Sequence, residues 1–448
     1  MLIEQLRTAA AARASDIENG AIVPRVTPGE IRNRLAKYDF ASPLSLEEVA
    51  ADVEDMMRTW HVQVTHPRYL GLFNPSVTFP GILGETLAAM YNPQLAAWRT
   101  SPAANEIERH TLAWLAVRFG LPAGVAANFT SGGSEANLSA VTVALTRAFP
   151  EYGEHGLRGI GSPTIYLTGE AHHGYNKIAH MTGIGRRALR IVPTDAHLRM
   201  DVGELAKQVA QDRKDGFAPF MVIATAGTTA AGIVDPLPEV ARFCRTEDLW
   251  FHVDAAWGGA AALSPRLRVH LAGIEDADSI TCDAHKWFSV PMGAGMFFCQ
   301  NADAVAHAFH GEISFMPATT AGGSDPYTAS TQWSRRFIGL KLFLSLAQYG
   351  ESGYAEMIEH QTCMAELLRE LLRGTGWRIV NDTPLPLVCF TRDGLDTSKF
   401  LSHLYERQIA WMSEARIGGG TAIRACITSF RTTPAHIHWI VRQMNELV

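Results

Sequence analysis

The chain has 448 residues, of which 47% are hydrophobic and 19% charged, and its formal net charge at pH 7 is −6. This length predicts more than one packed lobe at ~100–200 residues per domain, and the composition is that of a globular protein. The net negative charge argues against a general nucleic-acid binder, which needs a basic face. The sequence contains no run of ~18 uncharged apolar residues, so no membrane span is predicted.

Residues 1–60 predict helices joined by loops. One helix start is predicted at Thr27 and another at Ser45, where the pattern Ser-Leu-Glu-Glu resembles a capping box. The stretch from His66 to Trp98 is rich in proline and aromatic residues and is too irregular to predict a single element.

From about residue 104, helical patterns alternate with short apolar segments. The predicted helices are Asn105–Phe119, Ser134–Ala148, Val202–Asp212 and Leu237–Thr246. The predicted strands are Thr164–Leu167, Phe220–Thr225, Leu249–Val253, Ser279–Cys282 and Ala294–Cys299. Buried strands separated by helices are typical of an α/β domain with a mainly parallel sheet.

The tail predicts a smaller α+β lobe. A long helix begins near Lys341, and later strands are predicted at Pro386–Phe390 and Ala422–Ile427. We therefore expect an N-terminal helical segment over 1–60, a large domain over 61–340 and a small C-terminal domain over 341–448.

The first motif that carries chemistry is Asn128–Asn137 (NFTSGGSEAN). It joins a predicted strand to a helix start through Gly132-Gly133, and free backbone N–H groups and the helix dipole there favour a phosphate. The Ser134 hydroxyl adds a hydrogen bond. No lysine follows the glycines and the spacing is not GxGxxG, so neither a P-loop nor a dinucleotide fingerprint is predicted. An ordinary turn is the alternative for this motif taken alone.

Two further motifs follow strand ends. His172, just after the strand Thr164–Leu167, can lie flat over an aromatic ring, although alone it can equally be an ordinary loop histidine. Asp254 ends the strand before Ala255-Ala256-Trp257. A carboxylate there can keep a pyridine nitrogen protonated, and the small Ala256 leaves room for a flat ring. No His/Asp/Glu cluster with metal spacing accompanies it, so no metal is expected.

The fourth motif is the lysine of Asp283-Ala284-His285-Lys286-Trp287, just beyond the strand Ser279–Cys282. A lysine in an apolar setting can act as a Schiff-base amine, and ligands in open α/β sheets bind near the carboxyl ends of strands. Taken alone, it can be an exposed loop lysine. Together the four motifs predict an enzyme that holds pyridoxal phosphate (PLP) as a Schiff base on Lys286.

The six cysteines form no CxxC pair. We expect free, mostly buried thiols, as in a reducing cytoplasm, rather than disulfides or a zinc site. The N-terminus has early charges and no long apolar core, so no secretory signal is predicted. A cytoplasmic protein is expected.

In this order the motifs resemble those of the PLP-dependent group II amino-acid decarboxylases, which include the aromatic-L-amino-acid, histidine and glutamate decarboxylases. The matching stretches are SGGSEAN, EAHHGYNKIA, ATAGTTAAGIVDPL, FHVDAAWGGAA, DSITCDAHKW and QWSRRFIGLKLF, with HPRYLGLFNPSVTFPG and WRTSPAANEIE upstream. The resemblance runs from about residue 60 to the end, and HVDAAWGG with HKW is highly specific. It implies PLP fold type I (aspartate-aminotransferase-like) and a homodimer with sites at the interface.

The resemblance also implies residue roles around the cofactor ring. Lys286 forms the Schiff base and Asp254 pairs with the ring nitrogen. His172 stacks on the ring and contributes to reaction control, and Ala256 packs beneath it.

Other roles concern the phosphate and the substrate. Gly133, Ser134 and His285 are expected around the phosphate, and Ser334 is expected to reach the phosphate of the neighbouring subunit. Arg424 matches an arginine that binds a substrate carboxylate in related enzymes, with an ordinary structural arginine as the alternative.

The sequence departs from the family in two places. The family's mobile loop often carries a tyrosine that protonates the product, but the only tyrosine of the matching stretch Glu312–Ser330 is Tyr327, close to its end. The proton donor is therefore not identified. Asp283 stands where relatives often have asparagine.

The expected reaction is decarboxylation of an L-amino acid to the corresponding amine. Alternatives on the same scaffold are a carbon–carbon lyase of the sphingosine-phosphate-lyase type, a decarboxylation-dependent aldehyde synthase and an aminotransferase. A catalytically silent PLP-binding homologue is the alternative from another class. Neither the outcome nor the amino acid follows from the sequence.

The resemblance places the substrate side chain against the stretches that begin at Phe73-Asn74-Pro75 and at Gln94. Relatives that take large rings often have an aromatic residue at the position of Ala96. Unpaired buried amides penalise an apolar ligand by ~1–3 kcal/mol each, so Asn74 and Gln94 predict a polar or acidic side chain. An enlarged pocket that still takes an aromatic side chain is the alternative.

Overall fold

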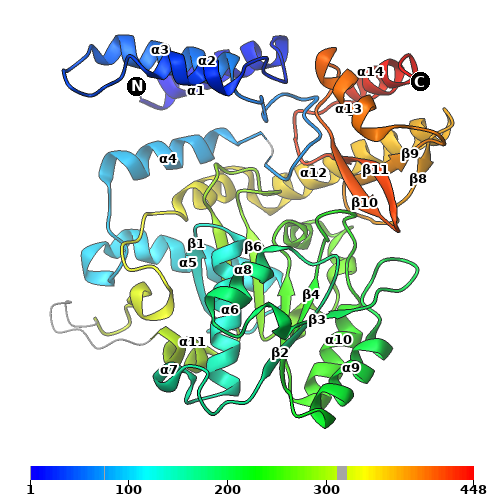
Figure 1. The fold of residues 1–448 in the computed structure, drawn as a ribbon. Coiled ribbons are helices and arrows are strands. Elements are labelled where there is room, and N and C mark those ends of the chain that lie inside the picture. The colour runs from blue at the N-terminus through cyan, green and yellow to red at the C-terminus, as the bar shows by residue number, and fades with distance from the viewer. Residues whose placement is uncertain (1, 75, 310–319) are drawn as a thin grey trace.

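The computed structural model describes residues 2–74, 76–309 and 320–448 (Figure 1). A large sheet lies in the lower part of the molecule, and a second, smaller sheet lies above it beside the chain's C-terminus. The α/β fold class predicted from the sequence is confirmed, with one mainly parallel sheet and one small antiparallel sheet.

The large sheet has seven strands in the order β1-β7-β6-β5-β4-β2-β3. The run from β6 to β3 is parallel, whereas β7 is antiparallel to both of its neighbours. The middle strands are almost entirely buried, as expected for a sheet covered on both faces. The strands are β1 (Ala126–Thr130), β2 (Pro163–Thr168), β3 (Leu189–Val192), β4 (Ala218–Thr225), β5 (Trp250–Asp254), β6 (Ser279–Asp283) and β7 (Gly295–Cys299).

Helices cover this sheet (Figure 1). The helix α6 packs on β6 and β7 through small residues such as Ala136 and Ala140, which let its axis approach the strands. The helices of this part are α5 (Pro102–Arg118), α6 (Gly133–Ala148), α7 (Tyr152–His155), α8 (Gly174–Met181), α9 (Val202–Lys214), α10 (Leu237–Glu247) and α11 (Ala302–Phe309). Each predicted helix and strand of this region corresponds to one of these elements, and its ends shift by a few residues at most.

The smaller sheet is antiparallel, in the order β10-β11-β9-β8. The long helix α12 (Leu340–Arg373), predicted from Lys341, bends at Gly350, whose φ of 65° is in the left-handed region. The other elements are α13 (Thr397–Glu406), α14 (Pro434–Asn445), β8 (Arg378–Ile379), β9 (Leu387–Thr391), β10 (Ser413–Ile417) and β11 (Gly420–Cys426). The division at residues 60 and 340 stays a prediction.

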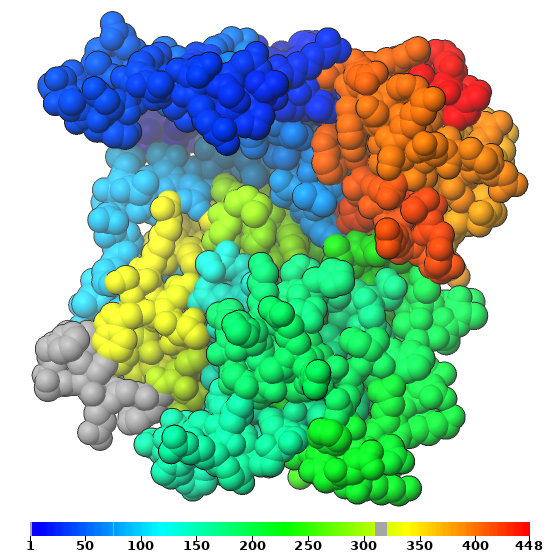
Figure 2. Space-filling view, viewed as in Figure 1, coloured from blue at the N-terminus to red at the C-terminus, as the bar shows by residue number. Residues whose placement is uncertain are grey.

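The N-terminal helices form a separate layer over the rest of the chain (Figure 2). They are α1 (Leu2–Asn19), α2 (Pro28–Leu35) and α3 (Leu46–Thr59), and α4 (Phe79–Tyr91) lies beneath them against α12. Both predicted starts, Thr27 and Ser45, are helix N-caps, but the reciprocal capping box is formed by Thr27 with Glu30. None of the described helices is both long and apolar enough to cross a lipid bilayer.

Candidate active site

Three neighbouring strands of the large sheet end side by side with polar residues. Thr225 on β4 is paired in register with Asp254 on β5, and Asp254 is paired with Thr281 on β6. Asp283 ends β6, and Lys286 follows it by three residues. Because parallel strands present their carboxyl ends at one edge, the Asp254 and Lys286 motifs meet there, as the sequence predicts.

A cavity of about 340 Å³ opens at this edge, within the range of ~300–1,000 Å³ typical of ligand sites. Seven of the eight predicted cofactor-binding residues line it, and Ser334 is exposed and is not among the lining residues. The seven are Gly133, Ser134, His172, Asp254, Ala256, His285 and Lys286.

The N-terminus of α6 faces the cavity. Its N-cap residue is Gly132, which has no side chain that can cap the helix. The first N–H groups of a helix attract an anion. A Cβ atom at Gly133 would lie 2.9 Å from Asp283 Oδ2, so a larger residue would require the Asp283 carboxylate or the helix to move.

The carboxylate of Asp254 is buried and held by three donors. Its Oδ2 accepts hydrogen bonds from Asn137 Nδ2 at 2.9 Å and from the Tyr175 hydroxyl at 3.3 Å. Its Oδ1 accepts from the backbone N–H of Ala256 at 3.1 Å. These contacts fix the orientation of the carboxylate at the cavity wall.

The amine of Lys286 lies 2.9 Å from Asp283 Oδ2, and the lysine side chain is 21% exposed. The other oxygen, Asp283 Oδ1, is buried and has no hydrogen-bond partner among the described residues. Burial lowers the pKa of the neighbouring His285. Asp283, noted as a departure from the family, therefore supplies the counter-charge that holds the amine in the cavity.

Burial lowers the pKa of the His172 imidazole against the opposing effect of Asp254, which favours the neutral ring. The backbone N–H of Gly174 donates to His172 Nδ1 at 3.1 Å. In the neutral ring the proton is then on Nε2.

Sequence reasoning missed three residues at this site. Asn137 and Tyr175 contact Asp254 directly. Thr225 lines the cavity, and its buried hydroxyl has no partner among the described residues. The available signal was the strand-end position of Thr225, one strand away from Asp254.

Of the predicted substrate-binding residues, Phe73 lies near Lys286 and Arg424 lies near Phe73, but neither is among the residues that line the cavity. The Phe73 ring stacks on Trp257 with centroids 4.5 Å apart, and Lys286 Nζ is 5.9 Å from the Phe73 centroid. The Arg424 guanidinium lies 4.7 Å from the same centroid. Asn74 accepts a hydrogen bond from the Tyr69 hydroxyl at 3.1 Å, while Pro75 lies outside the described residues.

Arg424 is buried between the two sheets. Its Nε donates to the carbonyl of Thr229 at 2.9 Å, and its Nη1 donates to that of Gly71 at 2.8 Å. Its Nη2 has no partner among the described residues. One guanidinium nitrogen is therefore left for a ligand.

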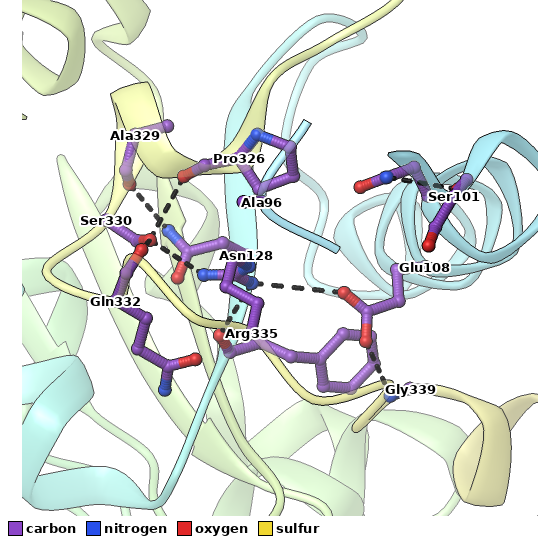
Figure 3. A network of polar contacts seen from close by, with 12 residues as sticks. Ala96, Ser101, Glu108, Asn128, Pro326, Ala329, Ser330, Gln332, Arg335 and Gly339 are labelled. Carbon is purple, nitrogen blue, oxygen red and sulfur yellow. Dashed lines mark hydrogen bonds and ion pairs between the residues drawn. The ribbon is translucent and has the colours of Figure 1, made fainter. Parts of the chain in front are cut away.

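Gln94 and Ala96 contact a different polar network, centred on Arg335. Figure 3 shows Arg335 with its partners Ser330 and Glu108. Gln94 Oε1 accepts from the backbone N–H groups of Ala96 and Arg335 at 3.2 and 2.9 Å. Arg335 donates to Ser330 Oγ and lies 3.9 Å from the buried Glu108. Within one chain neither Gln94 nor Ala96 lines the cavity.

Tyr327 also lies in this region. Its backbone N–H donates to the carbonyl of Ala96, and its ring centroid is 4.8 Å from that of Trp333. It is not among the residues that line the cavity. The first part of the predicted loop, 312–319, lies outside the described residues.

The residues of the cavity fit PLP. The N-terminus of α6 suits the phosphate, Asp254 suits the ring nitrogen and Lys286 provides an amine for the aldehyde. The unpartnered hydroxyl of Thr225 is a buried hydrogen-bonding group on the same wall.

Known proteins resemble this chain over most of its length. A model of the pyridoxal-dependent decarboxylase conserved domain matches residues 28–392. The chain is 29% identical over 438 residues to an aromatic-L-amino-acid decarboxylase of Bacillus atrophaeus, covering 93% of this chain and 88% of that one. It is 27% identical over 454 residues to 4-hydroxyphenylacetaldehyde synthase of Rhodiola rosea, and the match covers 96% of this chain and 91% of that one.

A solved structure agrees in its fold. The structure of Catharanthus roseus tryptophan decarboxylase in complex with L-tryptophan superposes with a TM-score of 0.90 at 25% identity. The superposition covers 99% of this chain and 96% of that one.

Proposed function

Because the chain belongs to the pyridoxal-dependent decarboxylase family, we propose that the cavity around Lys286 is its active site. The protein is a PLP-dependent carboxy-lyase that releases CO2 from an L-amino acid. One observation carries the site assignment: Lys286, Asp254 and the uncapped N-terminus of α6 line one cavity. Release of CO2 from a panel of amino acids by the purified, PLP-loaded protein tests the activity.

This geometry supports the following proposed residue roles. When bound, PLP supplies an aldehyde carbon and a protonated ring that draws electrons from the bond broken at Cα. Asp254 holds the proton at the ring nitrogen, and Lys286 provides the amine that retains the cofactor. His172 covers the ring, and Ala256 leaves space beneath it.

The remaining cofactor-binding residues hold the phosphate. Gly133 and Ser134 offer the N-terminus of α6, and His285 approaches from the loop after β6. Anchoring the phosphate there would keep the aldehyde end of the cofactor within reach of Lys286.

Arg424 is proposed to bind a carboxylate of the substrate. Its free Nη2 and its position beside Phe73 support this role. A guanidinium and a carboxylate form a strong charge-assisted hydrogen bond.

Two classes of substrate side chain are supported by different observations. Asn74, Gln94 and Arg424 favour a polar or acidic side chain, although Asn74 and Gln94 already accept hydrogen bonds within the chain. The Phe73–Trp257 stack near Lys286 favours an aromatic side chain, as does the name of the B. atrophaeus relative. Comparison of kcat/KM for aspartate and glutamate with that for tyrosine, phenylalanine and tryptophan separates the two classes.

An aldehyde product is the second candidate outcome. Tyr327 does not line the cavity of its own chain, and it bonds to Ala96, which we assign to the partner's cavity, so its position does not separate the two outcomes. The Rhodiola rosea relative is named as an aldehyde synthase. Ammonia and peroxide released together with CO2 mark this outcome, whereas CO2 with a stable amine marks a simple decarboxylase.

A homodimer is proposed as the working unit. Gln94, Ala96 and Ser334 do not line the cavity of their own chain, so we propose that they complete the cavity of the partner. The helix α3 has no buried residue and leaves Leu46 and Met57 exposed, which favours its packing on a second copy. The free thiols of all six cysteines support a cytoplasmic location, and cell fractionation tests it.

A further inference from the structure

A line of buried polar side chains continues from Asp254 into the protein interior. Asn137 Nδ2 donates to Asp254 Oδ2 at 2.9 Å, and Asn137 Oδ1 lies 3.1 Å from His252 Nε2. His252 Nδ1 lies 2.8 Å from Ser279 Oγ, which also accepts from Trp250 Nε1 at 2.8 Å. Asn137, His252, Ser279 and Trp250 are all buried, so water does not compete for these bonds.

Three structural elements place these groups in one row. Trp250, His252 and Asp254 alternate along β5, and alternate residues of a strand point to the same face. Ser279 is the register partner of His252 on β6. Asn137 comes from α6, one turn beyond Gly133, so the helix at the phosphate end also contacts the carboxylate at the ring end.

The direction of every hydrogen bond in the row follows from Asp254. An ionised carboxylate only accepts, so Asn137 must present its amide nitrogen to Asp254 and its oxygen to His252. His252 must then donate from Nε2. Burial lowers the pKa of His252 to about 4, so the ring is neutral and its Nδ1 accepts from the hydroxyl of Ser279.

The row ends at a group that can only donate. The indole N–H of Trp250 bonds to the oxygen of Ser279 and leaves the hydroxyl proton of Ser279 to point at His252. All four donors therefore point toward Asp254. Reversing one bond would leave a buried donor or acceptor unpaired, at a cost of ~1–3 kcal/mol.

Asp254 itself has limited capacity left. A carboxylate has about four lone-pair sites. Asn137, Tyr175 and the backbone N–H of Ala256 occupy three of them. One lone pair then remains for the N–H of a pyridine ring.

We propose that Asn137, His252 and Ser279 are positioning residues that hold Asp254 against the ring nitrogen of PLP. The inference rests on the proposed function of the cavity. Neutral His252 sets the orientation of the Asn137 amide, and this amide sets the orientation of the Asp254 carboxylate. The row acts on the ring nitrogen alone and has no effect on the phosphate end.

The test compares PLP with its analogue in which carbon replaces the ring nitrogen. His252→Phe removes both ring contacts, and His252→Gln keeps an amide donor for Asn137. The dissociation constant of each cofactor is measured on the full-length protein by equilibrium dialysis. We expect His252→Phe to weaken PLP binding by about tenfold, leave the analogue unaffected and lower kcat by about 100-fold, with KM little changed. His252→Gln should restore part of the loss.

Ser279→Ala is the milder variant if His252→Phe does not fold. This variant removes one hydroxyl and should weaken the binding of PLP more than that of the analogue. The loss of PLP affinity should be smaller than in His252→Phe. Ser345→Ala is the matched control, because this serine of α12 is also buried and lies away from the row. Its hydroxyl hydrogen-bonds to Thr78, the N-cap residue of α4. It should affect neither cofactor.

Two results for His252→Phe would overturn the inference. The variant could bind PLP and the analogue more weakly by the same factor, or it could bind both with unchanged affinity. Failure of the proposed function would look different, because the unmodified protein would then bind no PLP or release no CO2.

Discussion

Lys286 combines two properties at the residue scale. Its amine is close enough to Asp283 for an ion pair, and it opens into the cavity that Asp254 and the N-terminus of α6 also line. The lysine side chain is long and flexible, so the same amine can either pair with the Asp283 carboxylate or bond to an aldehyde in the cavity.

The first prediction separates these two properties. Lys286→Ala and Lys286→Arg should both abolish turnover, and borohydride should no longer fix the cofactor to the chain, as measured by intact mass. Lys286→Arg is the matched control because it keeps a cation beside Asp283 but cannot form a Schiff base. Retention of full turnover in either variant contradicts the assignment.

The second prediction concerns Asp254. Asp254→Asn removes the negative charge that raises the pKa of an adjacent cation, so turnover should fall by about 100-fold or more while the fold survives. Steady-state kinetics and circular dichroism measure the two effects. Asp212→Asn is the control, since this buried acid bonds to Tyr166 and Arg190 on the far side of the sheet. Near-normal turnover of Asp254→Asn rules out the electron-sink role.

The third prediction is a pH dependence of stability. Burial lowers the pKa of His66 from 6.5 to about 3, and the nearby Arg68 charge acts in the same direction. Between these two values the unfolded chain binds more protons than the folded one. The free energy of unfolding therefore falls as pH drops from 6.5 toward 3, by up to ~1.4 kcal/mol per pH unit from this group.

Urea unfolding of the protein and of His66→Gln at several pH values measures this effect. The variant should show a shallower decline below pH 6.5, because glutamine does not titrate. Parallel pH profiles for the two proteins would show that His66 is not the source.

At the scale of elements, α6 has two functions in the site. Its N-terminus lies at the proposed phosphate position through Gly133, and one turn later Asn137 contacts Asp254. One rigid helix would therefore set the distance between the two proposed ends of the cofactor, which loops alone would define less well.

The fourth prediction tests how closely α6 approaches β6. In Gly133→Ala the new methyl group would lie 2.9 Å from Asp283 Oδ2, so the carboxylate or the helix must move. We expect about a tenfold loss of PLP affinity, in line with a displaced anion site. Gly153→Ala is the matched control, because nothing lies within 4 Å of a Cβ atom at that position. Equal affinities of the two variants contradict this reading.

For the whole molecule, the exposed N-terminal layer is the feature that one chain does not explain. Figure 2 shows residues of α1–α3 as a layer beside the smaller sheet. Several large apolar side chains of these helices are exposed, among them Leu35, Leu46 and Met57. A closed two-fold dimer would bury such a face in both copies at once.

The fifth prediction follows from this layer. Sedimentation should show a dimer, and Met57→Asp on α3 should shift the protein toward monomers and lower its activity at low concentration. Val269→Asp is the control, because Val269 is also exposed and lies outside the layer. A fully active monomer would contradict both the dimer and the proposed role of Ser334.

The sequence alone determined the chemistry of the site and the class of fold. Gly133, Asp254 and Lys286 each follow or end a recognisable strand, and parallel strands bring such ends together by geometry alone. Local periodicity also located the main helices and strands, because a buried strand or an amphipathic helix leaves its pattern in the sequence.

Only the tertiary structure decided which side chains support those residues. Asn137 is 115 residues from His252, and His252 is 27 residues from Ser279, so their hydrogen bonds depend on how α6 lies over β5 and β6. Likewise, the absence of Gln94 from the cavity wall of its own chain follows from its hydrogen bond to Arg335. Contacts of this kind arise from the relative placement of whole elements, which periodicity and motifs do not encode.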